Sequence, residues 1–274
     1  MRQWRVIHAD VRDGLAQIEP GSVRTCVTSP PYWGAQRDYG HSQQLGMERT
    51  PELFVSTLVE VFRDVRRVLR KDGTLWLNIG DSYAASGKGD GGSLMSKRKQ
   101  AWGHRDRMRG WRAAPAGYKT KDIVGVPWLL ATALRADGWY LRRDIIWAKL
   151  VPTEPTRLDR PVSQHEMVFL LSKSPRYTYE LPAAQEGTIW QIASGNSDEH
   201  HLATMPIELA ERCISRGSKP SDLVLDPFAG RGTTGVAAIS LDRSFVGIDL
   251  NDQSVDLARR NIGAVAPLLA QEIA

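Results

Sequence analysis

Two consecutive prolines follow an apolar run near the start of the chain, in the segment 27–32 of sequence Val-Thr-Ser-Pro-Pro-Tyr. Proline has a fixed φ and no backbone N–H, so the carbonyl oxygens of Ser29 and Pro30 should face outward as acceptors on a stiff loop. An amino group can donate to both oxygens, and Tyr32 can stack on a planar ring beside them. A plain proline-rich turn is the competing interpretation when Pro-Pro occurs alone. The complete hexapeptide after an apolar run instead predicts a loop that holds a planar ring by its amino group.

The segment 226–234, of sequence Asp-Pro-Phe-Ala-Gly-Arg-Gly-Thr-Thr, is the second candidate site. Gly230 and Gly232 allow the backbone to approach a ligand closely, and Asp249, at the expected end of the next strand, suits ribose hydroxyls. A nicotinamide dinucleotide is the obvious competitor. However, the third glycine of a dinucleotide loop is missing, and Asp226 at the strand end would repel a pyrophosphate. An acidic residue there suits the cationic ammonium or sulfonium side of S-adenosylmethionine.

Alternating strand and helix patterns surround both segments and must position them. The strand patterns cover 4–8, 23–28, 74–79, 140–148, 223–225 and 244–248, and helical spacing covers 11–18, 51–69, 126–136, 206–215, 234–241 and the residues from 252. The recurring order strand, helix, strand predicts a parallel sheet with helical crossovers. Residues 168–172 and 177–180 are expected to form an antiparallel pair near the sheet edge. A basic last turn followed by Gly73 should end the helix 51–69.

At these residues the chain resembles the amino-group DNA methyltransferases of the β arrangement, in which the catalytic motif precedes the cofactor motif. Residues 28–32 match the catalytic motif in its Ser form, and residues 226–234 match the cofactor loop. Residues 75–81 resemble the strand after the catalytic helix, and residues 145–149, 165–166 and 173–174 resemble the later strands of phage-like members. The resemblance implies an α/β, Rossmann-like S-adenosylmethionine-dependent methyltransferase fold. Its sheet would be mostly parallel and seven-stranded, with an antiparallel edge strand and a circularly permuted motif order.

The same resemblance implies an activity and a set of site residues. The protein would transfer a methyl group from S-adenosylmethionine to the exocyclic amino group of a base flipped out of double-stranded DNA. The implied catalytic residues are Ser29, Pro30, Pro31 and Tyr32. The implied cofactor-binding residues are Asp10, Thr28, Met205, Pro206, Asp226, Pro227, Phe228, Gly230, Gly232, Thr233 and Asp249.

Positive charge is concentrated in one stretch of the chain. Between Lys88 and Lys121 there are ten Lys or Arg residues against two Asp, a net charge of +8, whereas the whole chain carries +5. Lys and Arg displace the counterions condensed on phosphates, so this charge predicts a nucleic-acid partner; a solvated charge-rich loop is the alternative. We expect residues 84–122 to form an inserted target-recognition loop or module. The predicted nucleic-acid-binding residues are Arg37, Lys97, Arg98, Lys99, Arg105, Arg107, Arg109 and Arg112.

The order of the two motifs separates this chain from chemically similar proteins. Relatives that methylate RNA or protein glutamine with an Asn-Pro-Pro-Tyr motif usually carry the cofactor motif first, whereas here it comes last, which favours DNA. In the family, the Ser form of the motif is more typical of cytosine N4 enzymes, whereas phage-like relatives with similar flanking residues include adenine N6 enzymes. The motif therefore does not decide which of the two bases is methylated. The alternatives are an RNA amino-methyltransferase and a non-catalytic DNA-binding regulator that retains the fold. A regulator would need neither Ser29 nor an intact cofactor loop.

The expected chemistry follows from the lone pair of an aromatic amine, which is delocalised into the ring. Ser29 and the Pro30 carbonyl would accept the amine hydrogens and turn the nitrogen towards the methyl group. The same oxygens would stabilise the positive charge that develops on nitrogen during in-line methyl transfer, without a covalent enzyme intermediate. This chemistry requires no metal ion.

Length and composition indicate one catalytic domain over residues 1–274. The chain reaches Asp10 without an apolar stretch of signal-peptide length, and the longest apolar stretch, 123–134, is too short for a membrane span. Cys26 and Cys213 lie far apart with no second ligand at metal spacing, which favours a reduced, cytoplasmic compartment. We therefore expect no membrane partner. A homodimer and a companion restriction endonuclease are further partners that the resemblance allows.

Several other residues allow two interpretations. His165 and Glu166 resemble an acid–base pair, but a structural pair that caps a strand is the favoured interpretation. The adjacent pair His200-His201 should point in two directions from a strand or helix, so a metal site is not expected there. Three residues just beyond the proline segment could equally fill the space left by a flipped base, contact phosphates or simply pack: Trp33, Arg37 and Tyr39.

Overall fold

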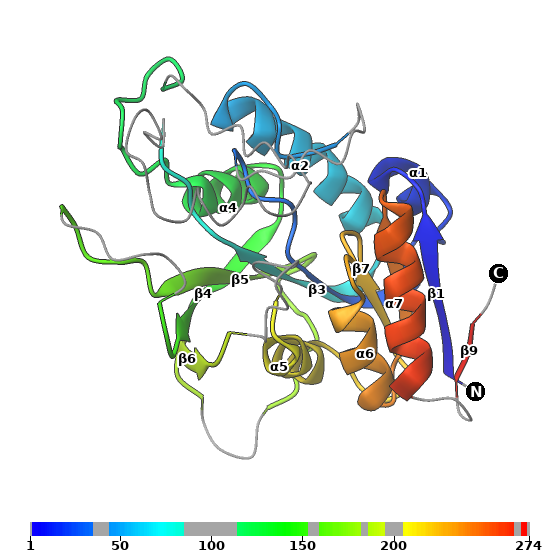
Figure 1. Cartoon of the computed structure of the whole chain (residues 1–274). Coiled ribbons are helices and arrows are strands. Elements are labelled where there is room, and N and C mark those ends of the chain that lie inside the picture. Colours follow the sequence, from blue (N-terminus) through cyan, green and yellow to red (C-terminus); the bar gives the residue numbers. More distant parts are fainter. Residues whose placement is uncertain are drawn as a thin grey trace, which may run out of the picture.

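The structure is a computed structural model, and it describes residues 2–34, 44–84, 114–152, 159–181, 186–194, 205–265 and 270–272. These residues form one sheet of nine strands. The strands are β1 (Arg2–His8), β2 (Val23–Thr28), β3 (Leu69–Ile79), β4 (Tyr140–Lys149), β5 (His165–Ser172), β6 (Ile189–Ile192), β7 (Leu223–Asp226), β8 (Ser244–Asp249) and β9 (Ala270–Glu272). In space they follow the order β6–β4–β5–β3–β2–β7–β8–β1–β9 (Figure 1).

All neighbouring strands in this sheet are parallel except β5, which runs antiparallel to both β3 and β4. The predicted α/β class with a mostly parallel sheet is confirmed. The predicted position of the antiparallel strand is wrong, because β5 lies third from one end rather than at the edge. The short strands β6 and β9, of four and three residues, extend the expected seven strands to nine. Strands this short carry too little alternation to be detected in a sequence.

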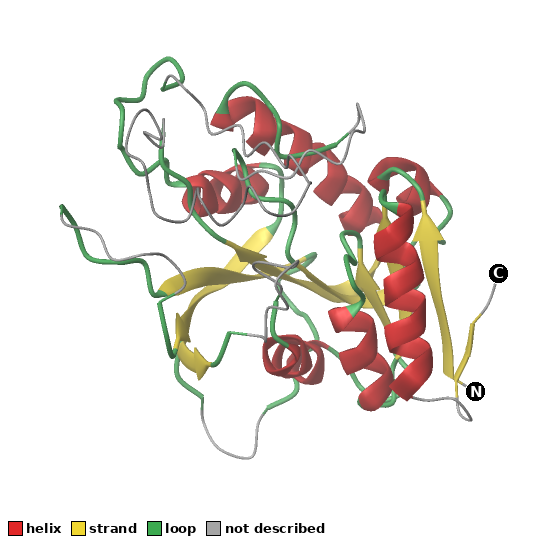
Figure 2. Cartoon of the chain, viewed as in Figure 1, coloured by secondary structure: helices red, strands yellow, loops and turns green. Residues whose placement is uncertain are grey.

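Helices cover both faces of the sheet (Figure 2). On one face lie α1 (Val11–Ala16), α2 (Pro51–Val68) and α4 (Val126–Ala136), and on the other lie α5 (Ile207–Gly217), α6 (Thr233–Ser240) and α7 (Asp252–Val265). Each face has its own buried apolar cluster. The alternation of strand and helix along the sequence therefore produces three layers, as expected from crossovers between parallel strands.

Helix α2 begins at the predicted residue, but the residues that end it differ from the prediction. At its start the Thr50 hydroxyl accepts a hydrogen bond from the Leu53 amide at 3.2 Å. The predicted stop at Gly73 is wrong, because β3 begins directly at Leu69 and residues 70–73 interrupt its pairing with β2 as an irregular bulge. Gly73 therefore lies in this bulge and not at the end of a helix.

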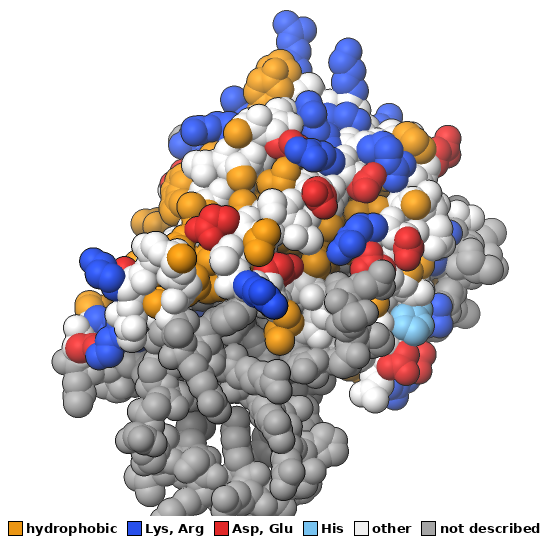
Figure 3. Space-filling model, turned by 90° about the horizontal axis from the view of Figure 1, so that it is seen from above, with side chains coloured by type: hydrophobic (Ala, Val, Ile, Leu, Met, Phe, Trp, Pro, Cys, Tyr) orange, Lys and Arg blue, Asp and Glu red, His pale blue; other side chains and the backbone are white. Residues whose placement is uncertain are grey.

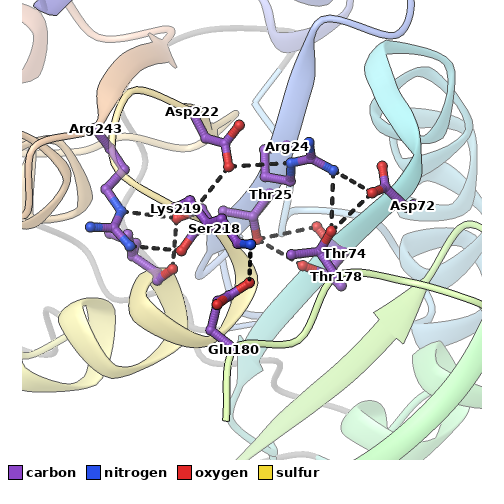
Figure 4. Close-up of polar contacts among 11 residues, drawn as sticks. Arg24, Thr25, Asp72, Thr74, Thr178, Glu180, Ser218, Lys219, Asp222 and Arg243 are labelled. Carbon is purple, nitrogen blue, oxygen red and sulfur yellow. Dashed lines mark hydrogen bonds and ion pairs between the residues drawn. The ribbon is translucent and has the colours of Figure 1, made fainter. Parts of the chain in front are cut away.

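Residues 177–180 do not form the predicted strand; they close a polar cluster at the amino ends of β2, β3 and β7 (Figure 4). Arg24 of β2 pairs with Asp72 at 2.5 Å and with Asp222 at 3.3 Å. The Thr178 hydroxyl accepts from Arg24 at 3.1 Å and donates to Asp72 at 3.0 Å. The Thr178 amide also donates to the Asp72 carbonyl, so this segment binds the bulge instead of a strand ladder.

Among the described residues, no helix combines the length and the apolar character that crossing a membrane requires. The described residues also bring together no group of three metal-ligating side chains. Cys26 and Cys213 are both free and buried, and burial raises the pKa of each thiol above its ordinary value. Neither thiol is therefore activated as a nucleophile.

Candidate active site

The carboxyl ends of the parallel strands meet at one edge of the sheet. Strands β1, β2, β3, β4, β7 and β8 share one direction and all end there, whereas the antiparallel β5 begins there. This edge of an α/β sheet is the usual place for ligand sites. It brings together two segments that are 198 residues apart: residues 28–32, which we call the proline loop, and residues 226–234, which we call the glycine loop.

The proline loop leaves β2 beside β7. Thr28 is fully buried, and its hydroxyl donates to the carboxylate of Asp226 at 2.7 Å. Pro30 is buried, while Ser29, Pro31 and Tyr32 are half-buried and keep part of their surface accessible. The predicted loop at the end of a buried strand is thus present, with Thr28 as its anchor.

The ring of Tyr32 lies against Gly80, the residue that follows β3. A side chain at Gly80 would place its Cβ only 2.7 Å from Tyr32 Cε2, so the ring can take this position only beside a glycine. Burial, followed by the negative charge of Glu166, raises the pKa of the Tyr32 hydroxyl well above its ordinary value, with smaller opposing contributions from Ser29 and Gly80. Tyr32 is therefore a neutral phenol at physiological pH and can donate a hydrogen bond but cannot act as a base.

Glu166 accepts the hydrogen bond that Tyr32 donates. The Tyr32 hydroxyl lies 2.6 Å from Glu166 Oε2, the Asn78 amide donates to the same oxygen at 3.1 Å, and Lys149 Nζ lies 2.6 Å from Oε1. Lys149 and Glu166 are only 8% and 10% exposed. His165 and Glu166 are consecutive residues of β5, so their side chains point to opposite faces of the sheet and do not form a pair; His165 is exposed. The sequence does not reveal this role of Glu166, because the partners of its carboxylate come from distant strands and loops.

Asp226, the last residue of β7, holds the glycine loop from within. It is 3% exposed and accepts hydrogen bonds from Thr28 Oγ1 at 2.7 Å, Thr234 Oγ1 at 2.6 Å and the Phe228 amide at 3.0 Å. Pro227 beside it is buried and Phe228 is half-buried. The carboxylate lies inside the loop rather than on its surface, so its influence on a ligand passes through the backbone that it holds.

The outer face of the glycine loop is open above Gly230. Gly230 and Gly232 have positive φ values of 52° and 84°. A Cβ on Gly232 would lie 2.9 Å from Ala258 of α7, whereas a Cβ on Gly230 would meet no atom closer than 4.0 Å. Beside this open face, Asp249 accepts from the amides of Gly230 at 2.8 Å and Asn251 at 2.9 Å. Such a bare backbone next to a half-exposed carboxylate fits a ligand that carries hydroxyl and cationic groups, as S-adenosylmethionine does.

Asp10 lies at the same edge, after β1. Its side chain caps α1 by accepting from the Arg12 amide at 2.9 Å, and it is 7% exposed. The register pairs His8 with Asp249, and the Ala9 amide donates to the Asp249 carbonyl at 3.1 Å. The two predicted cofactor carboxylates Asp10 and Asp249 therefore leave adjacent strands.

Met205 and Pro206 stand immediately before α5 and close to the glycine loop. Pro206 is buried, and Met205 is half-buried against the apolar cluster of that face. A shallow groove of about 350 Å³ joins the start of α5 to the end of the glycine loop and to α7; its lining residues are Ile207, Arg231, Thr233, Val236, Asn261 and Ala264. The predicted cofactor residues from three distant parts of the sequence thus gather around one loop.

All eight predicted nucleic-acid-binding residues lie outside the residues that the structure describes: Arg37, Lys97, Arg98, Lys99, Arg105, Arg107, Arg109 and Arg112. Tyr39 and the pair His200-His201, which are not among these predicted residues, also lie outside the described residues. On the described part of the face seen in Figure 3, Lys and Arg side chains are interspersed with Asp and Glu. Trp33 is fully buried and donates to the Glu48 carbonyl at 3.0 Å, so packing is its role.

The buried Asp226 carboxylate predicts a pH dependence of stability. Burial raises its pKa to about 6, from 3.8 ordinarily. The folded state then binds this proton more tightly than the unfolded chain, so the group lowers the free energy of unfolding as the pH rises from about 4 through about 6. We expect the wild type to lose about 1 kcal/mol relative to Asp226→Asn between about pH 5 and pH 7, measured by urea unfolding. A difference between the two proteins that stays constant with pH would contradict this assignment.

A family model described as DNA methylase matches residues 23–260 of the chain. The Type II methyltransferase M.SmaI of Serratia marcescens is 41% identical over 280 aligned positions, which cover 96% of this chain and 91% of that protein. The Type II methyltransferase M.Cfr9I of Citrobacter freundii is also 41% identical, with 92% and 85% covered.

Solved structures share the fold. The protein TTHA0409 of Thermus thermophilus, complexed with S-adenosyl-L-methionine, superposes with a TM-score of 0.68 at 24% identity and covers 100% of this chain and 98% of its own. The cytosine-N4-specific PvuII DNA methyltransferase gives a TM-score of 0.69 at 18% identity, with 94% and 86% covered. The Rossmann-like architecture predicted from the sequence is therefore confirmed.

Proposed function

Because this chain belongs to the DNA methylase family and is an S-adenosylmethionine-dependent DNA methyltransferase, we propose that its proline loop binds the exocyclic amine of a base turned out of double-stranded DNA. The observation that carries this proposal is the hydrogen bond from Thr28 to Asp226, which joins the proline loop to the glycine loop. A base on one loop and a cofactor on the other would then lie side by side, as a direct methyl transfer requires.

In this proposal the proline loop provides the acceptors for the amine. The Ser29 side chain or carbonyl and the Pro30 carbonyl accept the two amine hydrogens, which draws the lone pair out of conjugation. Tyr32 is held as a neutral phenol and supports one face of the base. The same oxygens stabilise the charge that grows on nitrogen in the transition state.

The glycine loop and its neighbours would hold the cofactor. S-adenosylmethionine supplies an electrophilic methyl group on a cationic sulfur. Asp249 would accept from its ribose hydroxyls, Asp10, which caps α1 just after the adjacent strand β1, would lie at the adenine end, and Met205 and Pro206 would lie at the methionine end. Asp226 supports this site indirectly, through the three donors that its carboxylate orders.

Nucleoside analysis tests the proposed reaction directly. DNA from a host that expresses the chain should contain N4-methylcytosine or N6-methyladenine, identified by mass spectrometry, and which of the two appears defines the target base. A Ser29→Ala variant serves as the matched control. Methylated RNA without methylated DNA would favour the RNA alternative. DNA binding without any binding of S-adenosylmethionine in calorimetry would favour the non-catalytic regulator.

The proposal also covers the protein partners of this chain and its cellular compartment. The Type II methyltransferases among the relatives support a companion restriction endonuclease, since enzymes of that type belong to restriction-modification systems. A homodimer stays a prediction from the resemblance, and a cytoplasmic location stays a prediction from the two isolated cysteines. Sedimentation of the purified chain alone and with DNA measures the first.

We propose that the basic insert, residues 84–122, contacts DNA phosphates. Replacing Lys97, Arg98 and Lys99 together by Ala should lower DNA affinity. It should also flatten the plot of log affinity against log salt by roughly one unit for each phosphate that is no longer neutralised. Filter binding at several salt concentrations measures both effects. An unchanged slope would show that these three residues are only solvated surface.

A further inference from the structure

The carboxylate behind Tyr32 has no part in the amine-binding step described above. Glu166 is nearly buried, at 10% exposure, and its oxygens are directed at protein groups: Tyr32 and Asn78 at Oε2, and Lys149 at Oε1. Removing a carboxylate and an ammonium from water costs free energy, and their attraction often does no more than offset this cost, so such a pair is weak evidence for a purely stabilising role. The arrangement therefore calls for a role in the site.

The topology explains why these four groups meet. Lys149 ends β4, Glu166 is the second residue of β5, and Asn78 lies near the end of β3. Because β5 is antiparallel, its beginning lies at the same edge as the ends of β3 and β4, where Tyr32 arrives from β2. The interior position of β5 thus delivers one carboxylate to the back of the proline loop.

Two contacts define where the Tyr32 ring lies. Gly80 supports the ring face, since a Cβ there would come within 2.7 Å of Cε2, and Glu166 holds the hydroxyl at the far end of the ring. Lys149 and Asn78 in turn hold the carboxylate, so it cannot follow the phenol if the ring rotates. A side chain that is fixed before binding loses less entropy when a ligand stacks on it.

We propose that Glu166 is a positioning residue that sets the plane of the Tyr32 ring, and through it the position of the extruded base. This inference rests on the function proposed above, in which Tyr32 stacks on that base. Glu166 does not act as a proton acceptor from the base, because both its oxygens are already occupied by three protein donors. Its effect on the reaction should pass entirely through the Tyr32 hydroxyl.

A double-mutant cycle tests this proposal. Tyr32→Phe, Glu166→Gln and the double variant are compared with the wild type in single-turnover methyl transfer, with labelled S-adenosylmethionine and DNA from a host without DNA methylation. Tyr32→Phe removes the hydrogen bond to Glu166. In Glu166→Gln the single remaining oxygen should face the Lys149 ammonium, which leaves an NH2 group that cannot accept from Tyr32. Each single variant should therefore be slowed about fivefold, and the double variant should also be slowed only about fivefold. The affinity for S-adenosylmethionine, measured by calorimetry, should stay unchanged in all three proteins.

Other outcomes overturn the proposal. If the two effects multiply, so that the double variant is slowed about 25-fold, Glu166 acts independently of Tyr32. A Glu166→Gln variant as fast as the wild type would contradict the proposal equally. If Glu166→Gln alone does not fold, Lys149→Met combined with Glu166→Gln removes both buried charges and enters the same cycle. A wild-type protein that transfers no methyl group would instead contradict the proposed function itself.

Glu186 provides the matched control. It forms an ion pair with Arg216 at 2.7 Å, and both side chains are partly buried, at 24% and 17% exposure. Glu186→Gln removes a carboxylate from a comparable pair that has no contact with Tyr32 in the described structure. It should leave the methyl-transfer rate unchanged, so a loss of rate in Glu166→Gln cannot be attributed to the general cost of breaking an ion pair.

Discussion

Replacing Asp226 by Ala should weaken the binding of S-adenosylmethionine by roughly a hundredfold, because one carboxylate organises both loops of the site. The substitution leaves the Thr28 hydroxyl, the Thr234 hydroxyl and the Phe228 amide without their buried acceptor. Each unpaired buried group costs about 1–3 kcal/mol, so the glycine loop should no longer be held in one conformation. Calorimetric titration measures the affinity.

Asp249→Ala is the comparison within the same experiment. Asp249 is half-buried and accepts two loop amides, from Gly230 and Asn251, but it makes no contact with Thr28 in the described structure. We expect a loss of roughly tenfold in cofactor affinity, since about 1.4 kcal/mol corresponds to a factor of ten. Both variants should bind DNA nearly as well as the wild type, because phosphate contacts, which neither carboxylate makes, supply most of the affinity for DNA. An equal loss of DNA affinity would contradict the assignment.

The second large effect is expected at Tyr32. Replacement by Ala removes the ring that supports the extruded base, and stacking of an aromatic side chain on a base contributes about 1–3 kcal/mol. Methyl transfer should therefore fall roughly tenfold or more, with a much smaller change in cofactor affinity. Single-turnover kinetics and calorimetry measure the two quantities separately.

The Tyr32→Phe variant distinguishes the contribution of the aromatic ring from that of its hydroxyl. It keeps the aromatic face and loses only the hydrogen bond to Glu166, so it should stay active, within about fivefold of the wild type. The raised pKa of the hydroxyl already excludes ionisation at physiological pH, which argues against proton transfer by Tyr32. If Phe proves as damaging as Ala, the stacking account is wrong.

The sequence alone determined the elements that carry the site. Buried strands such as 23–28 and 244–248 have continuous apolar runs, and helices such as 126–136 have apolar residues at helical spacing, so local patterns locate them well. The proline and glycine loops could be recognised for a similar reason. Their chemistry depends on proline and glycine backbone properties, which are local and act at consecutive positions.

Only the tertiary structure decided which side chains of these elements contact one another. The contact between Tyr32 and Glu166 spans 134 residues, and it exists because β5 lies antiparallel between β3 and β4. Asp226 appeared in the sequence as a ligand-facing carboxylate, whereas the adjacency of β2 and β7 turns it towards Thr28. Local periodicity shows which face of a strand is buried, but it does not encode which strand lies next to it. The order of strands in the sheet is set by the packing of the whole chain, and it is this order that places three distant polar groups, Asn78, Lys149 and Glu166, behind the proline loop.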